Sequence, residues 1–188
     1  MIIIQGSVSN GGQKWSINNY KVKHELRRTI KTMTQQKTAT FGAGCFWGVE
    51  AAFEKVKGVT ATSVGYMGGH FPNPSYLDVL SRITGHAEVA QVQYDPNQVS
   101  YEELLQVFWS IHDPTQFNRQ GADRGEQYRS VIFYHDREQA VIAQQSKQQL
   151  EHSGVYKQPI ITQIQPASEY YLADDSHQNY YHKKKQKN

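Results

Sequence analysis

The sequence predicts an α+β domain, a two-layer sandwich in which helices pack on one face of a mixed β-sheet. Two observations support this prediction. Segments with strand and helix patterns follow one another in the order β-α-β-β-α-β-α-β, which contains the split βαβ unit of a ferredoxin-like core. The longer connections, above all residues 113–126, predict extended loops around that core.

The predicted core begins with a strand, a helix and a second strand. Residues 38–44 are a short apolar run, which predicts a buried strand. Residues 45–57 predict a helix, because their apolar side chains recur every three or four positions. Gly58 stands where a glycine ends many helices, and residues 59–66 predict the second strand.

The middle of the chain predicts a loop, a strand and a capped helix. Two prolines within 72–74 predict the loop, and residues 75–80 predict one or two helical turns. Residues 87–94 alternate in side-chain type as a strand does. The helix over 100–112 opens on a capping-box pattern, Ser-x-x-Glu.

The last third of the core begins with a long segment, 113–126, that is rich in glycine and polar residues and lacks periodicity. A strand over 127–135, a helix over 136–151 and a last strand over 160–165 follow it. Loops longer than about 12 residues inside compact domains are commonly functional. Residues 113–126 are therefore a candidate part of a functional site.

Charge is distributed unevenly along the chain. Residues 1–32 hold six basic side chains and one acidic one, the last six residues hold four lysines, and the remainder carries a net charge of −6. A nucleic-acid-binding domain is expected to carry its basic patch on the fold itself. We therefore interpret 1–32 as a disordered extension or the result of an upstream misreading of the start codon, with a transit peptide as the alternative. Residues 33–182 are interpreted as the domain and 183–188 as a solvated basic tail.

Composition excludes several classes of protein. With 38% hydrophobic and 20% charged residues, the chain is neither collagen-like nor largely disordered. No apolar run approaches the roughly 20 residues needed to cross a bilayer, and the opening Met1–Ile4 is too short for a signal peptide. We expect a cytoplasmic monomer that binds neither nucleic acid nor membrane.

Cys45 is the only cysteine, so an intrachain disulfide is excluded. It lies where a predicted strand passes into a predicted helix, and the N–H groups at a helix N-terminus favour a thiolate, the nucleophilic form. Gly42 and Gly44 permit tight backbone geometry before it, and Phe46 and Trp47 place aromatic surface beside the sulfur. The alternative is an inert cysteine within an apolar core.

The motif Gly44-Cys-Phe-Trp-Gly48 resembles the signature of the peptide methionine sulfoxide reductases of type A. Five ordered segments with compatible spacing are a specific match, and the resemblance covers roughly residues 38–182. The other matching segments are Gly65–Gly69 with Asn73–Tyr76, Thr84–Val89, Gly121–Ser130 and Glu169–Gln178.

The resemblance implies a role for each matching residue. Cys45 matches the family's nucleophile, and Glu88 matches the acid that gives a proton to the sulfoxide oxygen. Tyr76 and Tyr128 match two tyrosines that bind this oxygen, and Asp123 matches a carboxylate on the loop beside them. Such a set is chemically sensible, because burial keeps a carboxylic acid neutral and phenols stabilise charge on the oxygen.

The resemblance also implies the substrate and the reductant. It implies thiol-dependent reduction of methionine (S)-sulfoxide, free or in oxidised proteins, through a Cys45 sulfenic acid, with Phe46 and Trp47 as walls of the substrate methyl pocket. It implies no bound metal or organic cofactor. Many members carry a second, resolving cysteine, which this chain lacks. An external thiol must therefore reduce the sulfenic acid, either thioredoxin or glutathione with a glutaredoxin.

Without the resemblance, each of these residues has an ordinary structural interpretation. A mid-strand glutamate such as Glu88 usually faces solvent, most tyrosines simply pack, and Asp123 could be a turn residue. A metal site is not indicated, because the histidines lack convincing ligand spacing. The histidines considered are His70, His86, His177 and His182. We expect His177 to make a structural hydrogen bond.

Two other functions stay open at this point. A cysteine hydrolase would need a histidine paired with Cys45, and the papain-type signature is absent around this residue. A binding module would use the basic ends of the chain, so removal of 1–32 and 183–188 would abolish binding and leave reductase activity intact.

Overall fold

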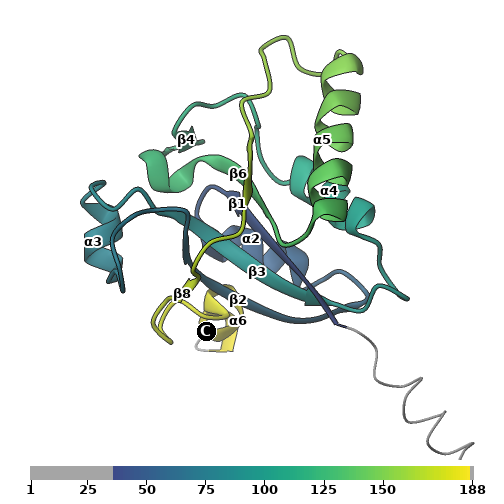
Figure 1. The fold of residues 1–188 in the computed structure, drawn as a ribbon. Coiled ribbons are helices and arrows are strands. Elements are labelled where there is room, and N and C mark those ends of the chain that lie inside the picture. Colours follow the sequence, from purple (N-terminus) through teal and green to yellow (C-terminus); the bar gives the residue numbers. More distant parts are fainter. Residues whose placement is uncertain (1–35, 187–188) are drawn as a thin grey trace, which may run out of the picture. The chain divides into compact units, whose positions relative to one another are not determined.

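The computed structural model describes residues 36–186, and its centre is a six-stranded mixed sheet (Figure 1). The strand order is β7-β6-β1-β3-β2-β8. Strands β6 and β7 are parallel, and the other neighbouring pairs are antiparallel. The strands are β1 (Lys37–Ala43), β2 (Val59–Met67), β3 (Ala87–Tyr94), β6 (Ser130–Tyr134), β7 (Gln163–Pro166) and β8 (Tyr171–Leu172).

The four central strands form the predicted split βαβ core. Strand β3 lies between β1 and β2 and is antiparallel to both, so β1 and β2 run in the same direction. Helix α2 (Phe46–Phe53) connects β1 to β2, and helix α4 (Tyr101–Ser110) lies between β3 and β6 in the chain. The predicted α+β fold with a mixed sheet is confirmed.

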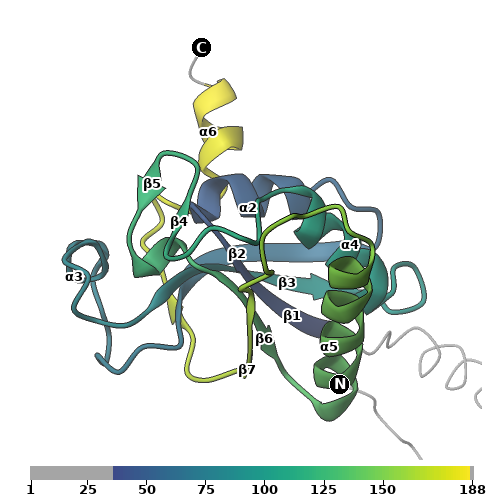
Figure 2. The ribbon, with the colours of Figure 1, turned by 90° about the horizontal axis from the view of Figure 1, so that it is seen from above.

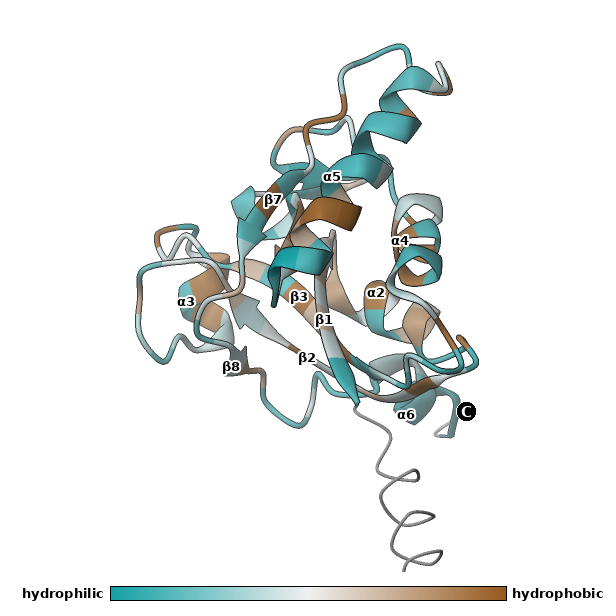
Figure 3. Ribbon diagram, turned by 45° about the vertical axis from the view of Figure 1, so that its right-hand side comes forward, coloured by the Kyte–Doolittle hydropathy of each residue, from teal (hydrophilic) through white to brown (hydrophobic). Residues whose placement is uncertain are grey.

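Helices α2 and α4 cover one face of the sheet, and Figure 2 shows them above the strands. The ring of Phe41 on β1 stacks against Phe53 of α2 at 4.9 Å and against Phe108 of α4 at 5.3 Å. The predicted capping box is present, because Ser100 and Glu103 each accept the other's backbone N–H. The long helix α5 (Arg137–His152) packs beside α4 and is mostly hydrophilic (Figure 3).

The other face of the sheet is covered by the chain between β7 and β8. Ala167 and Tyr170 of this segment pack on buried Met67, Val89 and Phe133. Figure 1 shows the segment, in yellow-green, running across the strands. Both faces of the central strands are therefore buried, and the C-terminal part of the chain is built into the fold.

Several element boundaries differ from the prediction. The strand expected over 127–135 begins only at Ser130, because a 3-10 turn, η1 (Glu126–Tyr128), precedes it and its N–H groups bond within the turn. The loop expected over 113–126 contains a hairpin of β4 (Arg119–Gln120) and β5 (Asp123–Arg124). Helix α2 ends at Phe53, before the expected residue 57.

Three further elements complete the described chain. Helix α3 (Tyr76–Leu80) falls within the predicted helical turns over 75–80. Strand β8 and helix α6 (Tyr180–Gln186) were not predicted from the sequence. The expected tail over 183–188 begins inside α6, and the extension expected over 1–32 lies outside the described residues. No helix within 36–186 is long and apolar enough to cross a membrane.

The docking of β8 on β2 depends on a glycine. A Cβ at Gly65 would collide with the carbonyl oxygen of Tyr171 and with the Tyr170 ring. We expect Gly65→Ala to lower the free energy of unfolding by about 1–3 kcal/mol, the usual cost of overpacking. Gly48 in α2 is the matched control, because a Cβ there meets nothing within 4 Å.

Gly48→Ala should instead stabilise the protein by about 0.5–1 kcal/mol, the helix-interior preference for alanine. Urea unfolding of both variants measures the two effects. Equal stabilities would show that the β2–β8 contact does not constrain the fold.

Candidate active site

Cys45 lies between β1 and α2, and the backbone conformation of the residue before it requires glycine. Gly44 has φ +92°, and a Cβ on it would lie 2.7 Å from Cβ of Gln120. Cys45 is the N-cap residue of α2, yet its side chain makes no capping hydrogen bond. The partly buried sulfur therefore faces the N–H groups at the start of the helix without a capping hydrogen bond and is available for chemistry.

Glu88, on β3, is buried against the start of the same helix. Its side chain is on the face of β3 covered by α2, it is 1% exposed, and its Oε2 accepts the backbone N–H of Phe46 over 3.1 Å. Burial raises the pKa of Glu88 to about 7, against the lowering effect of the Phe46 N–H. The interpretation of Glu88 as a solvent-facing strand residue is therefore wrong, and the group can be a neutral acid near pH 7.

The pKa of Cys45 shifts in the direction opposite to the prediction. Burial, and then the charge of Glu88, raise it to about 11, while the N–H groups of Trp47 and Gly48 lower it by less. The expected thiolate at a helix N-terminus is therefore not the resting form. Since the charge of Glu88 raises the pKa of Cys45, the protons of the two groups are coupled, and we treat Cys45 and Glu88 as a pair.

Two predicted tyrosines lie around this pair. Tyr76 opens α3 and Tyr128 ends η1, so they come from separate loops. Burial and then the charge of Glu88 raise the pKa of both, that of Tyr128 to about 12, and both also feel Cys45. Both phenols thus keep their protons at neutral pH and are hydrogen-bond donors beside Cys45 and Glu88.

Asp123 is exposed on the hairpin beside this group. Its charge raises the pKa values of both Cys45 and Glu88, which places it near them. The side-chain amide of Gln120 holds the hairpin in place, accepting the N–H of Asp113 and donating to the Asp113 carbonyl, each over 3.0 Å. The structure thus brings together the five polar residues that the sequence singled out.

Phe46 and Trp47 form an aromatic cluster with two residues that the sequence analysis did not assign to the site. Trp47 Nε1 donates to His177 Nδ1 over 3.2 Å, which confirms the structural hydrogen bond expected for His177. The ring of Tyr180 stacks on Trp47 at 3.8 Å, and His177 also lies 4.4 Å from the ring of Tyr76. The matching segment Glu169–Gln178 was the only signal that pointed to His177, and none pointed to Tyr180.

Two side chains attach the C-terminal segment that carries His177 and Tyr180. Gln178 pairs with both backbone groups of Val64, accepting the N–H and donating to the carbonyl over 2.8 Å each. Buried Glu50 of α2 accepts the N–H of Asn179 over 2.7 Å. The helix that begins after Cys45 thus also anchors this segment.

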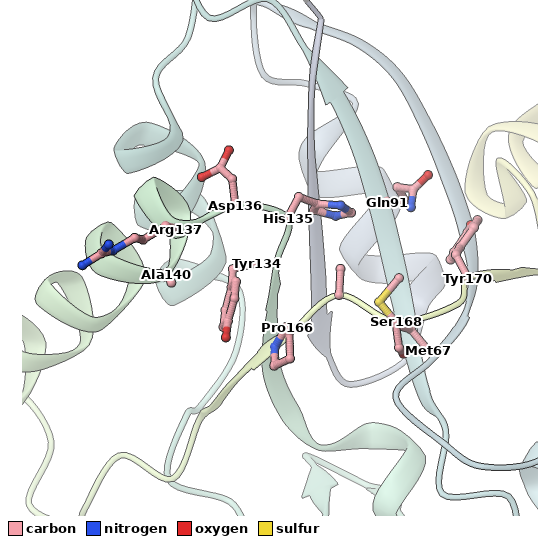
Figure 4. Close-up of a pocket in the computed structure, with 11 residues that line it drawn as sticks. Met67, Gln91, Tyr134, His135, Asp136, Arg137, Ala140, Pro166, Ser168 and Tyr170 are labelled. Atoms are coloured by element: carbon pink, nitrogen blue, oxygen red, sulfur yellow. The ribbon is translucent and has the colours of Figure 1, made fainter.

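A cavity of about 570 Å³ lies away from this cluster, on the other face of the sheet (Figure 4). Met67, His135 and Tyr170 are among its lining residues, and none of the predicted site residues lines it. Within 36–186, no group of three or more His, Cys, Asp or Glu is placed to hold a metal. In the same range no histidine hydrogen-bonds to Cys45, so the geometry does not favour a cysteine hydrolase.

Comparisons with known proteins agree with this geometry. The family model "Peptide methionine sulfoxide reductase" matches residues 37–188. Peptide methionine sulfoxide reductase MsrA 1 of Nostoc sp. is 68% identical over 152 residues, 81% of this chain and 93% of the relative.

Solved structures agree as well. Mxr1 of Saccharomyces cerevisiae in reduced form superposes with a TM-score of 0.75 and 35% identity, covering 80% of this chain and 87% of that one. Mxr1 in complex with Trx2 superposes with a TM-score of 0.55 and 27% identity, covering 77% and 84%.

The anchoring of the C-terminal segment can be tested through Glu50. Glu50→Ala leaves the partly buried N–H of Asn179 without its acceptor, and an unpaired group costs up to about 1–3 kcal/mol when it is buried. We expect amide hydrogen exchange in peptides covering 176–183 to become roughly tenfold faster or more, by local opening.

Glu54→Ala is the matched control, because Glu54 is an exposed glutamate that directly follows the same helix. Exchange in peptides of β1 should be unchanged in both variants. Unchanged exchange over 176–183 in Glu50→Ala would show that other contacts hold the segment.

Proposed function

This chain belongs to the peptide methionine sulfoxide reductase family, and from that premise we propose which of its residues carry out the reaction. The protein is a thiol-dependent oxidoreductase that reduces methionine sulfoxide and so repairs oxidised proteins. One observation supports the residue assignment above the others. The partly buried thiol of Cys45 lies beside a buried carboxyl, Glu88, whose pKa is raised to about 7.

In the proposed reaction, Cys45 Sγ attacks the sulfoxide sulfur as a thiolate while Glu88 gives its proton to the sulfoxide oxygen. The sulfur–sulfur bond then breaks as the oxygen passes to Cys45. The proton that Glu88 gives is the one that the Cys45 thiol releases to it, so the net change is thiol plus sulfoxide to sulfenic acid plus thioether. The substrate sulfur is reduced by two electrons and Cys45 is oxidised by two.

The phenols of Tyr76 and Tyr128 bind the sulfoxide oxygen in this proposal. Both are neutral donors beside Glu88, so they stabilise negative charge as it develops on that oxygen. Asp123 favours the protonated form of Glu88, because its charge raises the pKa of that carboxyl.

Phe46 and Trp47 receive the methyl group of the substrate. The rings of these residues lie 6.4 Å apart beside Cys45, and Trp47 is held between His177 and Tyr180. An apolar wall on one side and phenols on the other distinguish the methyl group from the oxygen. This asymmetry supports selection of one sulfoxide epimer. The resemblance to the family implies that it is the S epimer.

An external thiol regenerates Cys45, because the chain has no second cysteine. A thioredoxin is the favoured reductant, since the yeast relative is known in complex with Trx2. Glutathione with a glutaredoxin is the alternative. A reaction that consumes thiols fits a reducing compartment, which supports a cytoplasmic location. The monomeric state stays a prediction.

The first test uses a peptide with racemic methionine sulfoxide and excess dithiothreitol. We expect loss of one oxygen from about half of the peptide, because one enzyme acts on one epimer. Cys45→Ser should abolish this loss. Mass spectrometry of the peptide follows the reaction, and chiral separation identifies the epimer consumed. Oxygen loss in Cys45→Ser would exclude this residue as the nucleophile.

The second test is the pH dependence of a single turnover without reductant. Below about pH 7 both Cys45 and Glu88 hold protons, and the neutral thiol is a poor nucleophile. Between about pH 7 and about pH 11, Cys45 and Glu88 together hold one proton. This state permits a Cys45 thiolate beside a neutral Glu88. We therefore expect kcat/KM to rise through pH 7 and to fall toward pH 11.

Glu88→Gln keeps the shape of the side chain but cannot give a proton. It should lower kcat/KM by about 10²–10⁴-fold, the usual contribution of a general acid, and remove the rise near pH 7. Glu54→Gln provides the matched control and should leave both kcat/KM and its rise near pH 7 unchanged. A normal rate in Glu88→Gln would assign the acid role to another group.

A further inference from the structure

The hydroxyl of Tyr66 is buried without a hydrogen-bond partner. Tyr66 lies on β2, is 1% exposed, and its hydroxyl contacts no donor or acceptor among the described residues. Among residues 36–186 only one other tyrosine hydroxyl, that of Tyr101, is buried in this way. A buried polar group without a partner is costly, so native proteins keep few of them and often at functional positions.

Tyr66 is directly opposite Glu88. The two residues pair in the β2–β3 register, so their side chains leave the sheet on the same face. Phe46 joins them, since its N–H donates to Glu88 and its ring lies 5.8 Å from that of Tyr66. Apart from burial, the charge of Glu88 is the largest influence that raises the pKa of Tyr66.

Glu88 has acceptor capacity that no other donor within 36–186 fills. Its carboxyl accepts one hydrogen bond, from the N–H of Phe46, whereas an ionised carboxylate offers about four acceptor sites. A buried carboxylate with one donor is poorly stabilised. The unused donor of Tyr66 and the unfilled acceptor of Glu88 thus lie in one buried environment, on neighbouring strands.

We propose that Tyr66 is a positioning residue whose hydroxyl donates a hydrogen bond to the Glu88 carboxylate once that carboxyl has given up its proton. This inference rests on the proposed acid role of Glu88. Tyr66 is called a positioning residue and not a catalytic one, because its hydroxyl is buried away from solvent and so from an approaching substrate. It stabilises the conjugate base that proton transfer leaves in the protein interior.

Other groups around Glu88 do not replace this donor. Asp123 is a carboxyl whose charge opposes that of Glu88, and Cys45 has lost its thiol proton once it attacks, so neither stabilises the carboxylate that proton transfer leaves. Tyr76 and Tyr128 are the donors assigned to the substrate oxygen. Asp174, the second charge that acts on Tyr66, is exposed and therefore screened by water. Glu88 is thus the acceptor that gains most from the Tyr66 hydroxyl.

Tyr66→Phe removes the hydroxyl alone and tests the proposal. Without the donor, ionisation of Glu88 is disfavoured, so the carboxyl should titrate at higher pH by about one unit, a tenfold change in its ionisation constant. Infrared spectra show this titration directly through the carboxylic-acid C=O stretch, assigned by its loss in Glu88→Gln. Single-turnover kcat/KM should fall about tenfold below pH 7 and approach the wild-type value above it, where the carboxylate is already formed before reaction.

Tyr101→Phe is the matched control, because it removes the other unpartnered buried tyrosine hydroxyl from the core around α4. Both variants should be at least as stable as the parent, and Tyr101→Phe should keep its infrared titration and its rate. In the Glu88→Gln background, Tyr66→Phe should have no further effect.

The outcomes separate the two proposals. An unchanged infrared titration in folded Tyr66→Phe, with Glu88→Gln still slow, would overturn the role of Tyr66 alone. A normal rate in Glu88→Gln would overturn the acid role on which it rests. Equal rate losses in Tyr66→Phe and Tyr101→Phe would show a general effect of core substitutions and also contradict the proposal.

Discussion

The hydrogen bond from the backbone N–H of Phe46 to the carboxyl of Glu88 is the interaction on which the site depends. It joins the first residue of α2 to the centre of the sheet over 3.1 Å, and it is buried. Because Cys45 directly precedes Phe46, this bond also helps to set the distance between Cys45 and Glu88, the proposed nucleophile and the proposed acid. It fills a free N–H at the start of the helix and provides one donor to a carboxyl that burial would otherwise leave alone. The start of α2 and the Glu88 carboxyl are therefore placed by the same contact.

The balance of burial against helix dipole decides how this pair is charged. A helix N-terminus stabilises a nearby anion by about 0.3–1 kcal/mol, and the N–H groups of Trp47 and Gly48 do act on Cys45 in that direction. Burial and the neighbouring carboxyl outweigh them, because both disfavour a second negative charge in the same small volume. The result is a thiol at rest beside an acid poised near neutral pH. A resting thiol is also less prone to oxidation before substrate arrives, because the thiolate is the form that oxidants attack.

The sequence was informative where local chemistry decides structure. The cap at Ser100, the period of the helices and the alternation of β3 depend on neighbouring residues, and all were predicted. Tyr128 was assigned to a strand, but it lies in a turn closed by hydrogen bonds around Gly125. The φ of +143° at Gly125 is not predicted by any local sequence pattern. The burial of Glu88 depends on which face of the sheet receives α2, a tertiary fact that alternation in β3 cannot reveal. The catalytic assignments came from a family resemblance, whereas Tyr180, whose position follows only from folding of the C-terminal segment, was missed.

The C-terminal segment shows how a chain with one cysteine can use its last residues. His177 and Tyr180 brace Trp47, while Gln178 and Glu50 attach the segment to β2 and α2. A resolving thiol on this segment would have to leave these contacts to reach Cys45, and the aromatic wall would open with it. Because the sequence holds no second cysteine, the proposed reaction does not require the segment to move, and the wall can persist while an external thiol approaches the sulfur. The site can therefore stay assembled throughout turnover, and the conformational entropy of ordering its residues is lost once, when the protein folds.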